Sequence, residues 1–276
     1  MTKEFEIIKS TGIRAPFSLE KLQESLRRSG ADKRLIDHIV KQVSDELYDG
    51  ITTREIYNRA FALLKKDTSV YASKYKLKKA IYELGPTGFP FEKFIAAILI
   101  YSGHSASTNV VVEGSCVDHE IDVIANKGAR KLLIECKFHS DKGKKCNVKV
   151  PLYINSRLRD IAGHPKHKNF DIGNGWVVTN TRFTRDAIKY GKCAGLYLLS
   201  WDFPEKHSLR ERIDRLGLYP ITVSTILSNR EKQFLLSRNI VLCRQLLKDS
   251  FFLDHLGVSE ARKKRILKEV ETLCAT

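Results

Sequence analysis

The sequence has no long apolar run. The longest, Phe94 to Tyr101, spans eight residues, whereas a membrane-spanning helix needs about 18, and no apolar segment follows Met1 as an export signal requires. Glycine and proline are scarce, at 16 and 7 of 276 residues, while 42% of the residues are hydrophobic. This composition excludes a collagen-like, low-complexity or disordered chain. We expect a folded, soluble, unexported protein with no membrane contact.

Cysteine is also scarce, and none of the six cysteines forms a Cys-x-x-Cys pair. A chain of this length needs no disulfides to hold a core, so we interpret the thiols as reduced and the location as cytoplasmic. No GxxxxGK[ST] or GxGxxG loop is present. The spacing Cys136-x-x-His139 is typical of zinc ligands, but strand alternation puts these side chains on opposite faces, which argues against a shared ion.

Acidic residues are outnumbered, because 32 Asp and Glu stand against 48 Lys and Arg, for a formal charge of +16. The excess is spread along the chain, at +5 for residues 1–84, +6 for 85–203 and +5 for 204–276. Neutralising phosphates releases condensed counterions, so a surface basic throughout favours a polyanionic partner such as DNA. Solubility alone is the alternative explanation, since net charge does not define a site.

The first part of the chain predicts a hairpin followed by helices. Residues 5–17 have the pattern of two short strands around a glycine turn. Thr52 and Glu55 form a T-x-x-E capping box that opens a helix. A basic amphipathic helix over 69–83 ends at Gly85-Pro86, a pair that terminates helices, and we take it as the first domain boundary.

Strands and helices then alternate. The expected elements are a helix from Pro90, three strands, a helix, a strand, a helix and a strand, with the last seven at residues 109–112, 120–125, 131–138, 151–161, 176–180, 183–193 and 195–200. This order predicts a mixed sheet with helices packed on its faces. The segment after Pro204 is helical. The fold class is therefore a multidomain combination of α+β and α/β.

The strand over 131–139 has two unlike faces. One face is apolar and carries Leu132, Ile134, Cys136 and Phe138, while the other carries Leu133, Glu135, Lys137 and His139. Burying Glu135 and Lys137 costs free energy unless the charges are paired or hold a metal. Asp122 lies 13 residues before Glu135 on a neighbouring strand. Two adjacent strands would thus bring Asp122, Glu135 and Lys137 together.

The residues beside Asp122 give its orientation. Ile121 and Val123 are expected on the face opposite to it. Two carboxylates suit Mg²⁺ or Mn²⁺, because such an ion takes one or two carboxylates and keeps other positions for water and phosphate. In this hypothesis Asp122 and Glu135 bind the metal, and Lys137 orients or deprotonates the attacking water. The alternative is a surface cross-strand pair of Glu135 and Lys137.

The spacing D-x(12)-E-x-K on consecutive strands resembles the PD-(D/E)xK nuclease superfamily. The segments GFPFEKFIAAIL, EIDVIA, IECK and WVVTNTRFTRDAIKYGKCAGLYLLSWDFP resemble its Mrr-like restriction endonucleases, over about residues 86–204. The resemblance implies DNA hydrolysis and a catalytic glutamate from the first helix, here Glu92. Ile121 stands where the motif has proline. Glu135 replaces the glutamine of many members, which restores a second acidic ligand.

The segments IIKSTGIRAPFSLEKLQESL and YDGITTREIYNRAFALL resemble the ATP-cone, over about residues 5–84. This nucleotide-sensing module occurs at the front of ribonucleotide reductases and in a bacterial repressor of their genes. The resemblance implies that Lys9 and Lys21 contact nucleotide phosphates and that Thr53 is a further contact. ATP or dATP is then the expected regulatory ligand. Solvated surface lysines are the alternative.

The helix expected after Ser18 would add its positive end to this phosphate site. The turn departs from the K-R-D-G common in reductases, because Ser10 and Thr11 follow the lysine. That change removes one guanidinium contact, which Arg14 is a candidate to replace.

We therefore expect an ATP-cone at 1–84, an Mrr-like endonuclease domain at 85–204 and a small helical domain at 205–276. The last loosely resembles a helix-hairpin-helix, whose basic run 262–265 would contact DNA phosphates; an amphipathic helix or a dimerisation element are alternatives. The expected function is Mg²⁺-dependent DNA hydrolysis regulated by nucleotide, in a homodimer, because one active centre cuts one strand. The rivals are a catalytically silent, nucleotide-responsive DNA-binding regulator and a structure-specific RNA nuclease.

Overall fold

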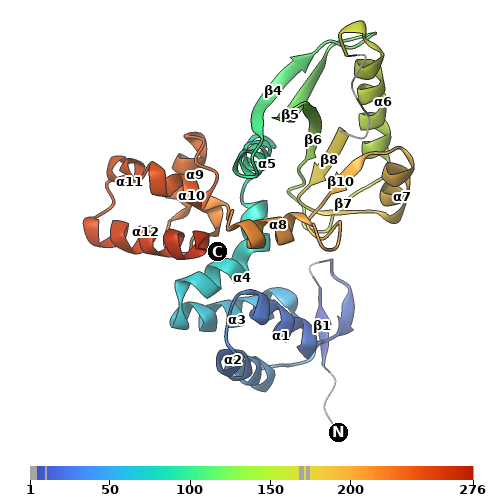
Figure 1. Cartoon of the computed structure of the whole chain (residues 1–276). Helices are drawn as coiled ribbons and strands as arrows, with labels where there is room; N and C mark the ends of the chain where they lie inside the picture. Colours follow the sequence, from blue (N-terminus) through green and yellow to red (C-terminus); the bar gives the residue numbers. More distant parts are fainter. Residues whose placement is uncertain (1–4, 10, 168–170, 172–174, 276) are drawn as a thin grey trace.

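The structure is a computed structural model that describes residues 5–9, 11–167, 171 and 175–275. Ser10, discussed above for the hairpin turn, lies outside these residues. The chain forms an N-terminal unit, a central sheet with flanking helices and a C-terminal group of helices, with helix α4 between them (Figure 1). Across the described ranges, no helix has both the length and the apolar character needed to cross a membrane.

A small sheet and four helices make the N-terminal unit. Strand β1 (Glu6–Ile8) pairs antiparallel with β2 (Arg14–Pro16) and parallel with β3 (Ile51–Thr52). The helices are α1 (Leu19–Arg28), α2 (Lys33–Asp45), α3 (Thr53–Asp67) and α4 (Ser69–Tyr82). Ser18 caps α1, and both hydrogen bonds of the Thr52 and Glu55 capping box are present, as the sequence predicts.

The central unit is a five-stranded sheet in the order β10-β8-β6-β5-β4. Its strands are β4 (Ser105–Val112), β5 (His119–Lys127), β6 (Arg130–Lys137), β8 (Gly175–Thr179) and β10 (Tyr197–Leu199). The first three form an antiparallel meander, and β8 and β10 run parallel to β6 and to each other. The mixed sheet expected from the sequence is confirmed.

Helices cover both faces of this sheet (Figure 1). Helix α5 (Phe89–Tyr101) packs on the face that carries Ile134, while α6 (Lys149–Gly163) and α7 (Arg185–Cys193) pack on the face that carries Leu133. A two-stranded parallel ladder, β7 (Lys145–Cys146) with β9 (Arg182–Phe183), and a 3₁₀ turn, η1 (Pro165–His167), complete the unit.

The C-terminal unit is helical and shares its core with the rest. Its elements are α8 (Leu209–Leu216), the 3₁₀ turn η3 (Ile221–Val223), α9 (Asn229–Ser237), α10 (Cys243–Lys248), α11 (Phe251–His255) and α12 (Glu260–Cys274). One apolar cluster joins Leu77 and Ile81 of α4, Phe94 of α5 and Val270 of α12. Ala72, in the first half of α4, packs instead in the N-terminal core. Helix α4 is therefore common to both cores.

Two of the four side chains in the basic run 262–265 form ion pairs within the protein. Arg262 pairs with Glu231, and Lys263 pairs with Asp254. Ile266, Val270 and Leu273 of the same helix are buried. These contacts favour the amphipathic-helix interpretation of this segment over a phosphate-binding turn.

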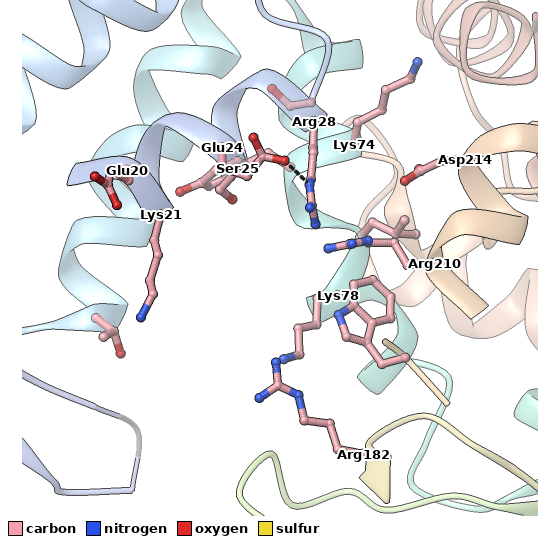
Figure 2. A pocket seen from close by; sticks show the side chains of 15 residues that line it. Glu20, Lys21, Glu24, Ser25, Arg28, Lys74, Lys78, Arg182, Arg210 and Asp214 are labelled. Atoms are coloured by element: carbon pink, nitrogen blue, oxygen red, sulfur yellow. Dashed lines mark hydrogen bonds and ion pairs between the residues drawn. The ribbon is translucent and has the colours of Figure 1, made fainter. Parts of the chain in front are cut away.

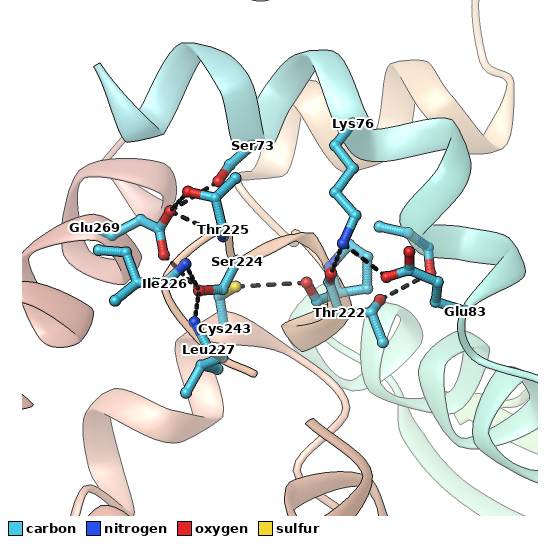
Figure 3. A network of polar contacts seen from close by, with 12 residues as sticks. Ser73, Lys76, Glu83, Thr222, Ser224, Thr225, Ile226, Leu227, Cys243 and Glu269 are labelled. Carbon is cyan, nitrogen blue, oxygen red and sulfur yellow. Dashed lines mark hydrogen bonds and ion pairs between the residues drawn. The ribbon is translucent and has the colours of Figure 1, made fainter. Parts of the chain in front are cut away.

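A buried carboxylate fastens α4 to the C-terminal unit (Figure 3). Glu269 of α12 is 2% exposed and accepts hydrogen bonds from the hydroxyls of Ser73, Ser224 and Thr225. It also accepts the backbone N–H of Thr225 at 3.1 Å. Because the Ser73 and Ser224 hydroxyls are buried, the carboxylate is their main partner.

We expect Glu269→Ala to lower the free energy of unfolding by about 2–4 kcal/mol, because it leaves several buried donors unsatisfied. Urea denaturation followed by circular dichroism measures the change. Glu271→Ala, on the exposed side of the same helix, is the matched control and should shift stability by no more than about 0.5 kcal/mol. Equal losses in the two variants would show that the network is not stabilising.

Lys232 of α9 supplies a pH dependence of stability. It is 5% exposed, and burial together with the neighbouring Lys76 lowers its pKa to about 7. In the unfolded chain a lysine titrates at about 10.4, so above pH 7 the unfolded state binds more protons and stability rises with pH. We expect a rise of about 1 kcal/mol between pH 7 and 8 that Lys232→Met abolishes. Urea denaturation at pH 7 and at pH 8 measures the free energy of unfolding. The same rise with pH in the wild-type protein and in Lys232→Met would contradict this.

Candidate active site

Strands β5 and β6 bring the predicted acidic residues together. They are antiparallel with Val123 opposite Ile134, and one further step of this register sets Asp122 opposite Glu135. The backbone ladder ends there. In its place the Asp122 carboxylate accepts the backbone N–H of Cys136 at 2.6 Å. Asp122 is thereby fixed between Glu135 and Lys137.

A kink in β4 and β5 orients Asp122. Asn109 of β4 has a left-handed φ of 55°, and the pairing of β4 with β5 skips Asn109 and Asp122. Ile121 packs in the core of Leu133, whereas Val123 packs in the opposite core. The expectation that Ile121 and Val123 share a face is therefore wrong. The reason is the interruption of pairing at Asn109 and Asp122. Residues on the two sides of it point to opposite faces of the sheet, whereas strict alternation would put Ile121 and Val123 on the same face.

Glu135 is a buried carboxylate with one unsatisfied oxygen. Its side chain is 9% exposed, and Oε2 forms an ion pair with the Arg157 guanidinium at 2.8 Å. Oε1 is buried and has no hydrogen-bond partner within the described part of the chain. Burial, and then the charge of Asp122, raises the pKa of Glu135 to about 8. A cation at Oε1 would supply the missing partner.

Asp122 has a similar environment. Burial raises its pKa, while the Cys136 N–H and the charges of Arg157 and Lys137 oppose that rise. Lys137 itself is exposed at the end of β6, and its carbonyl accepts the Thr179 hydroxyl at 2.7 Å. The ammonium is thus near Asp122 and free to face a substrate.

Glu92 lies at the edge of this cluster. It is in the first turn of α5, and burial, together with the charge of Asp122, raises its pKa to about 6. The Asn109 side-chain amide donates to both Glu92 and Glu120, at 3.4 and 3.3 Å. Across the described residues, no group of three or more His, Cys, Asp and Glu side chains is arranged to hold a metal. Asp122 and Glu135 offer two carboxylates, a number that Mg²⁺ accepts from a protein.

Arg157 is a site residue that the sequence analysis missed. It lies on α6, 22 residues after Glu135. Besides its ion pair with Glu135, its guanidinium donates to the backbone carbonyl of Glu120 and stacks 5.6 Å from the centroid of the Tyr153 ring. One side chain therefore ties β5, β6 and α6 together behind the carboxylates.

The expected nucleotide residues lie at one end of the N-terminal sheet. Because Ile8 is opposite Thr52 in a parallel pair, Lys9 and Thr53 leave their strands at the same end. Lys21 and Thr53 line a cavity of about 860 Å³, whereas Lys9 does not line it. Arg14, a candidate to replace the missing guanidinium, is engaged instead with Glu6 and Asp49.

Comparison with known proteins agrees with this organisation. Family models match as ATP cone domain over residues 5–83, as restriction endonuclease of the Mrr type over 86–202, and as AF1548-like, C-terminal, over 219–274. An uncharacterized protein of Archaeoglobus fulgidus is 32% identical over 178 residues, which cover 64% of this chain and 98% of that protein.

The crystal structure of AF1548, described as a protein of unknown function, is also similar. It matches with a TM-score of 0.56 and 30% sequence identity, over 68% of this chain and 98% of that one. The chain therefore belongs to the AF1548-like family. In this chain an ATP-cone precedes an Mrr-like restriction endonuclease domain of the PD-(D/E)xK superfamily.

Proposed function

We propose that this protein is a Mg²⁺-dependent endodeoxyribonuclease whose activity is controlled by ATP or dATP bound at the ATP-cone. The observation that carries the proposal is the buried, unpartnered Oε1 of Glu135 beside the carboxylate of Asp122. Two such groups next to an exposed lysine form a set that phosphodiester hydrolysis needs and that a stable fold does not.

In this proposal Asp122 and Glu135 hold the metal, which when bound supplies charge stabilisation at the phosphate and a more acidic water. Asp122 is kept in place by the Cys136 N–H. Lys137 orients the attacking water or accepts its proton, and Glu92 assists as a nearby acidic group. The charge of +16 supports DNA as the substrate. A homodimer would present one such centre to each strand.

One observation favours a second candidate function. The Arg157 guanidinium already occupies one oxygen of Glu135, as a built-in cation would in a site that no longer needs a metal. A nucleotide-responsive DNA-binding regulator with a silent nuclease domain would keep this ion pair permanently. The two candidates differ in whether the bound DNA is cut.

The test is incubation of the purified protein with supercoiled plasmid, with Mg²⁺ or EDTA, and with ATP, dATP or neither. The nuclease proposal expects nicked or linear plasmid with Mg²⁺ alone or with one of the nucleotides, and intact plasmid with EDTA. Intact plasmid in every mixture, combined with a nucleotide-dependent gel shift, would favour the regulator.

A further inference from the structure

A cavity lies between the three units. It measures about 860 Å³, in the size range of pockets that hold small ligands. Its walls come from α1 and α3 of the ATP-cone, from α4, from β9 of the nuclease domain and from α8 (Figure 2). The cavity therefore touches the nucleotide-sensing module and the nuclease domain at once.

Cations dominate this cavity. The lining includes six basic side chains and three carboxylates, namely Lys21, Arg28, Lys74, Lys78, Arg182 and Arg210 with Glu20, Glu24 and Asp214. Glu24 is already paired with Arg27 and Arg28. In the described part of the chain, no carboxylate lies within 4.0 Å of the ammonium of Lys21 or Lys78. Arg182 pairs with Asp202 at 2.6 Å and Arg210 with Glu211 at 3.0 Å, so among the described residues the unpaired positive charge of this lining lies on its lysines.

These cations face the same space. Figure 2 shows Lys21 on one wall and Lys78, Arg182 and Arg210 on the other, with their charged ends turned into the cavity. The Lys78 ammonium lies 6.0 Å from the centroid of the Trp201 ring, and the Arg210 guanidinium lies 5.9 Å from it. Asp202 and Glu211 offset the charges of Arg182 and Arg210, and an anion in the cavity would offset those of Lys21 and Lys78.

Two of these cations have further unfavourable features. Burial, followed by the charge of Arg182, lowers the pKa of Lys78. The Nε–H of Arg210 is buried without a hydrogen-bond acceptor. A second cavity of about 170 Å³ also borders on Lys78 and Arg182 and adds Lys142, Lys144 and Lys145. An anion with several charges would contact these cations from more than one unit at once.

We infer that this cavity is a shared site for a nucleoside triphosphate, whose phosphates are held by Lys21 of the ATP-cone together with Lys78, Arg182 and Arg210 outside it. The inference rests on the nucleotide regulation proposed above and makes the nuclease domain part of the nucleotide site. Multiple charge-assisted hydrogen bonds are the chemistry by which lysine and arginine recognise phosphates.

This site has a short physical connection to the catalytic strand. Arg182 follows Thr179 by three residues, and the Thr179 hydroxyl binds the carbonyl of Lys137. Between them, the side chain of Asn180 bonds the backbone N–H and carbonyl of His139, each at 2.8 Å. A ligand that holds Arg182 therefore acts on the turn that fixes the end of β6.

The test is calorimetric titration of the full chain with ATP and with AMP. We expect Arg182→Ala to weaken ATP binding by about tenfold or more, because it removes a charge-assisted contact, and to change AMP binding by less than about twofold. Lys78→Met should act in the same way without destabilising the fold, since it removes an unpaired charge. Arg185→Ala, an exposed arginine three residues further on, is the matched control.

Undiminished ATP binding by Arg182→Ala and Lys78→Met, with binding lost in Lys21→Ala, would overturn the inference and confine the site to the ATP-cone. Absence of ATP and dATP binding in the wild-type protein would overturn both the inference and the proposed regulation, while the plasmid assay judges the nuclease separately. Arginine-dependent ATP binding in a protein that cuts no plasmid would support the inference and reject the nuclease.

Discussion

Replacing Lys137 with alanine is expected to lower the rate of DNA cleavage by about a thousandfold. The side chain is exposed beside the buried carboxylate of Glu135 and the half-buried one of Asp122, so its ammonium is the group of this cluster most able to meet the attacking water. Single-turnover nicking of a plasmid, at saturating Mg²⁺, measures the rate. Because Lys137 is exposed, the melting temperature should stay within a few degrees of the wild-type value.

The matched control is Lys131→Ala, at the other end of the same strand. It removes one positive charge from β6 and is expected to change the cleavage rate by less than about threefold. A comparable loss in both variants would mean that Lys137 contributes only to the general attraction of DNA. In that case the lysine has no role in the chemical step.

Replacing Arg157 with alanine is expected to destabilise the metal-free protein by about 1–3 kcal/mol, because it removes the cation paired with Glu135 and a donor to the Glu120 carbonyl. Added Mg²⁺ or Mn²⁺ should restore part of that loss, since a divalent ion at Glu135 supplies the missing positive charge and stabilises whichever state binds it. Thermal unfolding in EDTA and in 10-fold steps of metal concentration measures both effects.

Arg159→Ala, two residues along α6 and exposed, is the control and should behave as wild type in both conditions. The comparison separates the two candidate functions. If metal restores nothing to Arg157→Ala, the Glu135 carboxylate is a partner for arginine alone, and the silent regulator gains support.

Local patterns were enough to predict much of the fold. The alternating residues of β6 predict its two faces, since Leu132 and Ile134 enter one core and Leu133 enters the other. The capping box at Thr52 is fixed by residues three apart. The D-x(12)-E-x-K spacing works for the same reason, because an antiparallel turn between β5 and β6 sets Asp122 opposite Glu135. Each of these features depends on neighbours within a few residues or on one hairpin.

Other features depend on contacts between distant segments. Asn109 has a left-handed backbone conformation at the point where β4 pairs with β5. The interruption there changes the faces on which Asp122 and Ile121 lie. Arg157 is one basic residue among several on its helix, so nothing in the sequence marks it as the partner of Glu135. Likewise Glu269 binds Ser73, 196 residues away. Such pairings require the assembled fold.

The most direct test of the central claim is the position of Mn²⁺ in crystals of the protein, located by anomalous scattering. The account predicts one peak at the carboxylates of Asp122 and Glu135, and no peak there in Asp122→Asn crystals. Manganese bound only elsewhere, with Glu135 still held by Arg157 in the wild-type protein, would contradict it.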